Sequence, residues 1–250
     1  MMRLKLALLF STLAMVTHAQ QEMLPEKRVR LGLKAGFNAS AFTREVAPFD
    51  GQRSAKYEDY QSNYRTSGLG GVTAQLILSK YFTFGAEALF NSRGMAYRQP
   101  NYRVVIVDDE GNESFAFNNF NYNIDYVEFP VMIYYGFKPP AYKTLISTYV
   151  GLAPATVINR KIKLRYEQGT NGSRSKGRFE ESTLNSVNPF NTSLLAGVQI
   201  AGDNSSTINL FGDLRFSHTL RPVFERNLTP EGGNLKTHMV TGSLSFGVRF

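Results

Sequence analysis

Apolar residues recur at every second position in eight separate stretches of this chain, a spacing that indicates β-strands rather than helices. In the last stretch, Leu244, Phe246, Val248 and Phe250 alternate with serine, glycine and arginine. No convincing amphipathic helix lies between the stretches, so the pattern predicts an all-β fold. The predicted strands cover residues 29–38, 69–79, 81–93, 124–137, 144–154, 190–201, 207–220 and 236–250.

The connections between the predicted strands alternate between long and short. Long polar connections would gather at one end of the structure, and short turns would gather with both termini at the other. This is the form of an outer-membrane barrel, so we predict an all-β, eight-stranded, antiparallel up-and-down transmembrane β-barrel. Residues 102–117 also have the pattern of a hairpin, which would raise the number of strands to ten if it joined the barrel. The long connections are 39–68, 94–123, 155–189 and 221–235, and the short ones are Lys80, 138–143 and 202–206.

The polar faces of the predicted strands favour a closed barrel over a soluble sandwich. A strand face in water normally collects Lys, Glu and Thr, whereas these faces carry small or amide side chains such as Asn191, Ser193 and Gln199. Such side chains suit the interior of a narrow barrel. Closure is also required in hydrocarbon, because unpaired edge groups are costly there. Aromatic residues near the strand ends predict an interfacial girdle, formed by Phe37, Tyr81, Phe82, Tyr135, Phe137, Tyr142, Phe190 and Phe250.

The beginning of the chain has the order of an export signal. A short basic start, an apolar run too short to cross a bilayer and two small residues follow one another. We predict a signal peptide over residues 1–19, a short lead over 20–28 and the barrel domain over 29–250. Without Arg3 and Lys5 the net charge falls from +8 to +6 and is spread out, so no nucleic-acid partner is expected. The chain has no cysteine, which excludes disulfides and thiol chemistry.

Five segments of the mature chain carry a family resemblance: VRLGLKAGFNAS (29–40), DYVEFPVMIYYGF (125–137), STYVGLAPATV (147–157), FGDLRFSHTL (211–220) and GSLSFGVRF (242–250). In this order they resemble the small outer-membrane β-barrel proteins described as PorT-like or porin-like. The resemblance implies insertion by the outer-membrane barrel assembly machinery. It also implies that the last strand, which ends in Phe250, is the insertion signal. Because fold does not fix function, the resemblance leaves the biochemical role open.

Five charged residues share the parity of the small polar residues that would face the barrel interior. Buried charges must be paired, so we predict an ion network that crosses several strands inside the barrel. Its expected role is to fix the register of the strands, and a conducting or proton-linked path is the alternative. The five residues are Glu87, Glu128, Asp213, Arg215 and Arg249.

An enzyme, a metal site and a cofactor are not expected. The mature chain has only two histidines, His218 and His238, and both have the parity of lipid-facing residues. Neither a Gly-x-Ser-x-Gly elbow nor a His-Glu-x-x-His helix is present. The acidic residues within 108–113 lack the spacing of an EF-hand loop, so a solvated turn is predicted there.

The third long connection is basic, and residues 160–178 would face outward, where phosphate groups of lipid lie. Contact with anionic lipid is therefore one interpretation, and a solvated charged loop is the other. Seven basic residues face three acidic ones, which leaves +4: Arg160, Lys161, Lys163, Arg165, Arg174, Lys176 and Arg178 against Glu167, Glu180 and Glu181.

Taken together, these patterns predict a monomeric outer-membrane barrel with a non-enzymatic envelope role. Its long external loops would contact a partner, a lipid or a ligand. Expected partners are outer-membrane lipid, the assembly machinery during insertion and an envelope protein. The alternatives are a narrow solute pore and a soluble, lipocalin-like ligand-binding barrel.

Overall fold

The computed structural model describes residues 29–43, 61–107, 110–137, 144–170, 173–202, 208–224 and 236–250. The signal peptide and lead predicted over 1–28 lie outside these residues, as do Tyr142, Asp108 and Asp109. In the part of the chain that is described, no helix is long and apolar enough to cross a membrane. The strands are β1 (Val29–Phe42), β2 (Gln61–Ile77), β3 (Phe82–Val107), β4 (Glu113–Glu128), β5 (Val131–Phe137), β6 (Thr144–Thr170), β7 (Ser173–Thr183), β8 (Phe190–Gly202), β9 (Asn209–Thr219) and β10 (Met239–Arg249).

These ten strands form an antiparallel sheet that closes into a ring. β10 pairs with β1 from Met239 opposite Phe42 to Arg249 opposite Gly32, which completes the ring. β4 and β5 follow one another along a single position of the wall, and β7 pairs with β6 outside the ring. Of the ten strands, β4 and β5 share one position and β7 lies outside the ring. The ring therefore has eight wall positions, as predicted. The 102–117 hairpin adds no strand to the ring, because it is the end of β3 and the start of β4.

The break between β4 and β5 lies at Phe129 and Pro130. Proline has no N–H to give to a ladder, so a regular strand cannot pass through it. The wall stays bonded nevertheless, because the N–H of Glu87 donates to the carbonyl of Pro130 at 2.9 Å. On the other side, the N–H of Phe129 donates to the carbonyl of Pro154 at 2.9 Å. The interruption is therefore a local bend within one continuous wall position.

Side chains alternate between the two faces of the wall in the opposite sense to a soluble barrel. Large apolar residues point outward, and Leu210 and Phe246 are 72% and 62% exposed. Small polar residues point inward and are buried, for example Ser193, Thr241 and Ser245. An apolar outer face and a polar interior fit a barrel that is surrounded by hydrocarbon. This arrangement argues against the soluble, lipocalin-like alternative.

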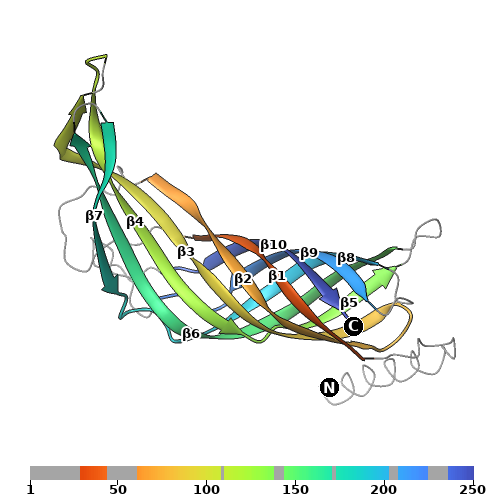
Figure 1. Ribbon diagram of the computed structural model, residues 1–250. Helices are drawn as coiled ribbons and strands as arrows, with labels where there is room; N and C mark the ends of the chain where they lie inside the picture. Colours follow the sequence, from red (N-terminus) through yellow and green to blue (C-terminus); the bar gives the residue numbers. More distant parts are fainter. Residues whose placement is uncertain are drawn as a thin grey trace.

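Two of the predicted long connections, 94–123 and 155–189, are largely strand, which corrects the sequence-based prediction. β3 and β6 contain 26 and 27 residues, whereas β9 and β10 contain 11 each. A strand of 9–11 residues is enough to cross a bilayer, so β3 and β6 must extend well beyond it. In Figure 1, β3, β4 and β6 continue past the ring toward the upper left, where β7 joins them. We call residues 99–107, 113–123, 159–170 and 173–183 the projecting sheet.

The ring has two different ends. Both chain ends of the described barrel and the turn between β2 and β3 lie at one end, which we call the turn end (Figure 1). Several of the predicted girdle aromatics are exposed there, and Tyr135 packs against Tyr81 and Phe82 with ring centroids 6.1 and 5.4 Å apart. Phe250 follows β10, is 52% exposed, and donates its N–H to the carbonyl of Leu31 at 2.9 Å.

Candidate functional site

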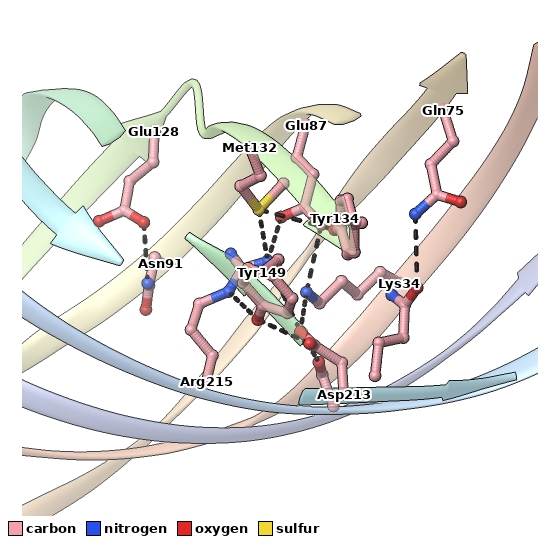
Figure 2. Close-up of polar contacts among 12 residues, drawn as sticks. Lys34, Gln75, Glu87, Asn91, Glu128, Met132, Tyr134, Tyr149, Asp213 and Arg215 are labelled. Atoms are coloured by element: carbon pink, nitrogen blue, oxygen red, sulfur yellow. Dashed lines mark hydrogen bonds and ion pairs between the residues drawn. The ribbon is translucent and has the colours of Figure 1, made fainter. Parts of the chain in front are cut away.

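The barrel interior contains a buried ion cluster, which we call the central cluster, formed by Lys34, Glu87, Tyr149, Asp213 and Arg215. The guanidinium of Arg215 lies 2.8 Å from Glu87 and 3.5 Å from Asp213, and Lys34 pairs with both carboxylates. Arg215 Nε donates to the Tyr149 hydroxyl at 2.9 Å, and that hydroxyl donates to Asp213 at 2.6 Å. Figure 2 shows that these side chains converge from opposite walls of the barrel. Two cations and two carboxylates therefore neutralise one another out of contact with water.

A second cluster lies further from the turn end. Arg93 pairs with Glu128 at 2.7 Å and lies 3.4 Å from the Ser193 hydroxyl. Asn91 donates to Glu128 at 3.1 Å and accepts from Asn38 at 2.6 Å. This cluster is also neutral, because one guanidinium faces one carboxylate. It ties four wall strands together: β1, β3, β4 and β8.

The single interior network expected from the sequence is divided in the structure. Glu87, Asp213 and Arg215 meet in the central cluster, whereas Glu128 belongs to the second cluster. Arg249 joins neither cluster, and its guanidinium lies over the Phe211 ring with 4.1 Å between guanidinium carbon and ring centroid. Sequence reasoning did not select Lys34, Tyr149 or Arg93. All three lie at inward positions of their predicted strands, so the same alternation could have identified them.

An apolar plug fills the interior at the end opposite the turn end. Phe42 of the wall and Tyr122 at the base of the projecting sheet pack there against Val187 and Phe224 from connecting segments. The Phe42 ring centroid lies 5.7 Å from Tyr122 and 5.4 Å from Phe224, in edge-to-face contacts. Val187 and Phe224 form a β-bridge, and neighbouring backbone bonds hold both segments across the interior. The full plug consists of Ala41, Phe42, Met95, Tyr97, Phe120, Tyr122, Ile124, Tyr126, Ala155, Ile162, Leu164, Val187, Val223, Phe224 and Met239.

On the outward face of the wall, a polar network lies where the projecting sheet begins. Arg65 donates to Asn123 at 2.7 Å and lies 3.2 Å from the Ser92 hydroxyl. Ser92 donates to Asp125 at 2.6 Å, and Asn159 donates to the same carboxylate at 2.8 Å. On β4, the outward residue below this level is Val127, and the next outward residues above it are Asn121 and Asn119. The network therefore marks the upper limit of the apolar outer surface on this side of the barrel.

The outward face of the projecting sheet combines asparagines with basic residues. Asn123 and Asn121 of β4 lie opposite Lys161 and Lys163 of β6. Both lysines contact Glu181 of β7, at 3.6 Å for Lys163, and both side chains are about 40% exposed. The hydrogen bond from Lys161 and the charge of Lys163 hold the pKa of Glu181 below its usual value. Residues 160–167 are thus part of a strand rather than the predicted loop, and the pairing of the strands sets the spacing of their side chains.

The two histidines of the mature chain lie together on the outside of the wall. The rings of His218 and His238 stack with centroids 5.4 Å apart, and His238 Nδ1 lies 2.8 Å from the Thr219 carbonyl. This position agrees with the outward parity predicted from the sequence. Within the described residues, no three His, Asp or Glu side chains gather in a geometry that would hold a metal ion.

An all-antiparallel ring with an apolar exterior and a polar, ion-paired interior defines a transmembrane β-barrel of the outer-membrane class. The sequence comparison is consistent with this, because the family model for the outer membrane protein beta-barrel domain matches residues 18–225. The chain therefore belongs to the outer membrane protein beta-barrel domain family, and it is an outer-membrane protein. The turn end is then the periplasmic end, and the projecting sheet lies outside the cell.

Solved structures of three bacterial barrels are similar to this chain at low identity. They are Neisserial surface protein A (12% identity, TM-score 0.36, covering 89% of this chain and 96% of that one), the attachment invasion locus protein Ail of Yersinia pestis (10%, 0.37, 90% and 100%) and OprG of Pseudomonas aeruginosa (8%, 0.36, 92% and 99%). Likeness at this level carries no argument about function. No curated protein sequence matches the chain.

Proposed function

We propose that this protein is a non-enzymatic, non-conducting outer-membrane barrel that holds a rigid external sheet for contacts outside the membrane. The observation that carries the proposal is the continuity of β3, β4 and β6, which run without a break from the wall into the projecting sheet. The contact surface is therefore a sheet fixed to the barrel rather than a set of loops. The order of the five sequence motifs supports a relationship to the PorT-like barrels.

The filled interior supports a role without solute passage. Two neutral ion clusters and the apolar plug occupy successive levels between the periplasmic and external ends. A solute crossing the barrel would have to break buried ion pairs, and breaking such a pair costs about 3–5 kcal/mol. The histidine pair lies outside the wall and away from these groups, which supports a non-enzymatic role.

We propose anionic lipid headgroups as the contact of the outward basic face. Lys161, Lys163 and Arg165 project from successive outward positions of β6, next to asparagine amides of β4. A phosphate held by several cations gains charge-assisted hydrogen bonds, and adjacent amides add neutral donors. The face begins directly above the apolar surface, at the height where headgroups meet the wall. The protein is expected to act as a monomer, inserted by the assembly machinery through the strand that ends at Phe250.

The two parts of the proposal are tested separately with the full, folded protein. In planar bilayers we expect no steady current, and an open-state current of constant size would contradict the non-conducting barrel. In nanodiscs, we expect anionic lipid to raise the midpoint of thermal unfolding relative to zwitterionic lipid. The combined variant Lys161→Gln, Lys163→Gln, Arg165→Gln should lose most of that increase.

A matched control removes the same charge elsewhere on the exposed surface. Lys80, Arg221 and Lys236 are exposed and lie outside the projecting sheet. The combined variant Lys80→Gln, Arg221→Gln, Lys236→Gln should keep the increase in midpoint that anionic lipid produces. Equal losses in the two combined variants would show a general charge effect and would contradict a specific headgroup contact.

A further inference from the structure

A pair of histidine side chains lies on the outer surface where β9 ends and β10 begins. His218 is the penultimate residue of β9, and His238 immediately precedes β10. Both side chains are half-buried, and their rings lie nearly parallel, with centroids 5.4 Å apart and 17° between the planes. Closer to the periplasmic end, the exposed outward residues of the two strands include Phe216 and Leu244. The pair therefore lies at the external rim of the apolar surface.

The pairing of the strands holds the two rings side by side. His218 lies opposite Val240, and His238 is two residues earlier along the chain, so both side chains point outward as diagonal neighbours. The backbone of His238 is also bonded to the residue that follows β1. Its carbonyl accepts from the N–H of Thr43 at 2.8 Å, and its N–H donates to the Thr43 hydroxyl at 3.0 Å. The wall thus sets the position of the pair.

A hydrogen bond determines which nitrogen of His238 is able to bind a metal. Nδ1 lies 2.8 Å from the Thr219 carbonyl. Because a carbonyl oxygen only accepts, Nδ1 carries the hydrogen, and in the neutral ring the lone pair is on Nε2. Histidines that bind metals almost always donate their other ring N–H to a carbonyl, a carboxylate or water. This bond therefore orients His238 as a metal ligand would be oriented.

The ring of His218 is available as a second ligand. Among the described residues it has no hydrogen-bond partner, since the side chains opposite it are Leu194 of β8 and Val240 of β10. Two imidazoles that share one metal through nitrogens at about 2.1 Å have ring centroids about 5 Å apart. The observed separation is close to this value. The χ2 torsion of histidine is broad, so rotation of the ring aims one His218 nitrogen at the point that His238 Nε2 faces.

The charges around the pair indicate which class of cation it would bind. Within the described part of the chain, neither ring forms an ion pair with a carboxylate, and the nearest charged residues along the sequence are Arg221 and Lys236, both exposed. A cation gains no attraction from basic neighbours, so coordination bonds to the imidazoles have to hold it. Mg²⁺ and Ca²⁺ require oxygen ligands, whereas imidazole suits Cu²⁺, Ni²⁺ and Zn²⁺.

We propose that His218 and His238 form a surface binding site for a divalent cation that prefers nitrogen ligands, such as Cu²⁺, Ni²⁺ or Zn²⁺. His238 Nε2 and one nitrogen of His218 are the protein ligands, and water completes the coordination. A bound metal joins the external ends of β9 and β10. The site is independent of the projecting sheet, because β10 lies across the ring from β4. Failure of the headgroup experiment would therefore leave this proposal untouched.

The test uses the full folded protein in detergent, without a histidine tag. Ni²⁺ is added in one series and Mg²⁺ in another, at constant pH and ionic strength, and the thermal unfolding midpoint is recorded. We expect a saturable increase with Ni²⁺ and none with Mg²⁺, because a ligand that binds the folded state stabilises it. Cu²⁺ should saturate at a lower concentration than Ni²⁺. The electron paramagnetic resonance spectrum of bound Cu²⁺ should show coupling to two imidazole nitrogens.

Single and double variants test whether the two rings share one metal. His218→Gln or His238→Gln alone should weaken Ni²⁺ binding by at least about tenfold, because in the parent protein the second imidazole binds intramolecularly. Each single variant should lose nearly all of the increase in midpoint, and the double variant should lose no more. Lys236→Gln is the matched control, since Lys236 is exposed and lies two residues from His238. It should bind Ni²⁺ at least as tightly as the parent protein.

Each outcome decides the proposal. The absence of a saturable effect of Ni²⁺, or an equal effect of Mg²⁺, would overturn it. Losses of about half in each single variant that add up in the double variant would show two separate sites and would contradict a shared metal. If the variants do not fold, the Cu²⁺ spectrum of the parent protein still decides, because coupling to only one imidazole nitrogen would rule out the pair.

Discussion

The barrel interior and the projecting sheet both contain pairs of a basic and an acidic side chain, but the interior pairs are buried and the sheet pairs are exposed to solvent. Arg215 and Glu87 meet with side chains only 6% and 3% exposed, whereas Lys161 and Glu181 meet with side chains 42% and 31% exposed. A buried charge that loses its partner stays out of water, whereas an exposed charge is taken up by solvent. The loss of one partner should therefore destabilise the fold strongly in the wall and only slightly on the sheet. This difference separates the part whose charges hold the fold together from the part whose charges remain exposed to solvent.

The largest effect should follow from the removal of Arg215. Arg215→Met leaves Glu87 and Asp213 with Lys34 as their only cation, so we expect the free energy of unfolding to fall by about 3–5 kcal/mol. The matched change on the sheet, Lys161→Met, should cost about 0–1 kcal/mol. Denaturant unfolding of both variants in the same detergent, or loss of the heat-dependent gel mobility of the folded barrel, measures the difference. Similar losses in both variants would refute the contrast between wall and sheet.

An intermediate effect is expected in the apolar plug. Val187→Ala removes two carbons from a fully buried side chain whose backbone forms a β-bridge with Phe224, and it should cost about 2 kcal/mol. Val105→Ala is the control on the projecting sheet, where the side chain is 47% exposed and the change should lie within about 0.5 kcal/mol of zero. The same unfolding measurements compare the two. A neutral Val187→Ala variant would mean that the plug is not a packed core.

The smallest effect is the pH dependence of the pair on the sheet. The pKa of Glu181 in the folded protein lies below its unfolded value, mainly through the hydrogen bond from Lys161. The pair therefore stabilises the fold at pH values above the unfolded pKa, and this contribution disappears as the pH falls through the folded pKa. Lys161→Gln should raise the pKa of Glu181 toward its usual value, which NMR titration of labelled glutamate would follow. An unchanged pKa would place the main cause outside this pair.

The ring of eight positions could be predicted from the sequence because hydrocarbon imposes a strict alternation. Wherever a strand crosses lipid, its outward residues must be apolar, as Leu210, Leu214 and Phe216 are in β9. The projecting sheet was missed because that constraint ends where lipid ends. On β4, Asn119, Asn121 and Asn123 took the outward positions and gave the segment the composition of a loop. The inward alternation of Phe120, Tyr122 and Ile124 was the signal that remained.

The alternation of inward and outward residues also predicted part of the interior ion network. What the alternation could not predict has a physical reason as well. Alternation shows which way Glu87, Asp213 and Arg249 point, but it carries no information about height in the barrel. Height depends on the register between strands, which brings Glu87 and Asp213 to one level and leaves Glu128 at another. The position of Gly32 opposite Arg249 on one side and Thr73 on the other depends on two registers at once, those of β1 with β10 and with β2. No single-strand pattern contains that information.

The unbroken course of β6 has a mechanical consequence. At about 3.3 Å per residue, its 27 residues span on the order of 90 Å, from the periplasmic rim to the external tip. The strand runs without a gap from the wall to the tip, so a pull on the tip along the strands loads many ladder bonds together in shear. A pull across the strands would instead peel those bonds one after another. An attachment at the tip would thus resist tension along the strand direction far better than tension across it.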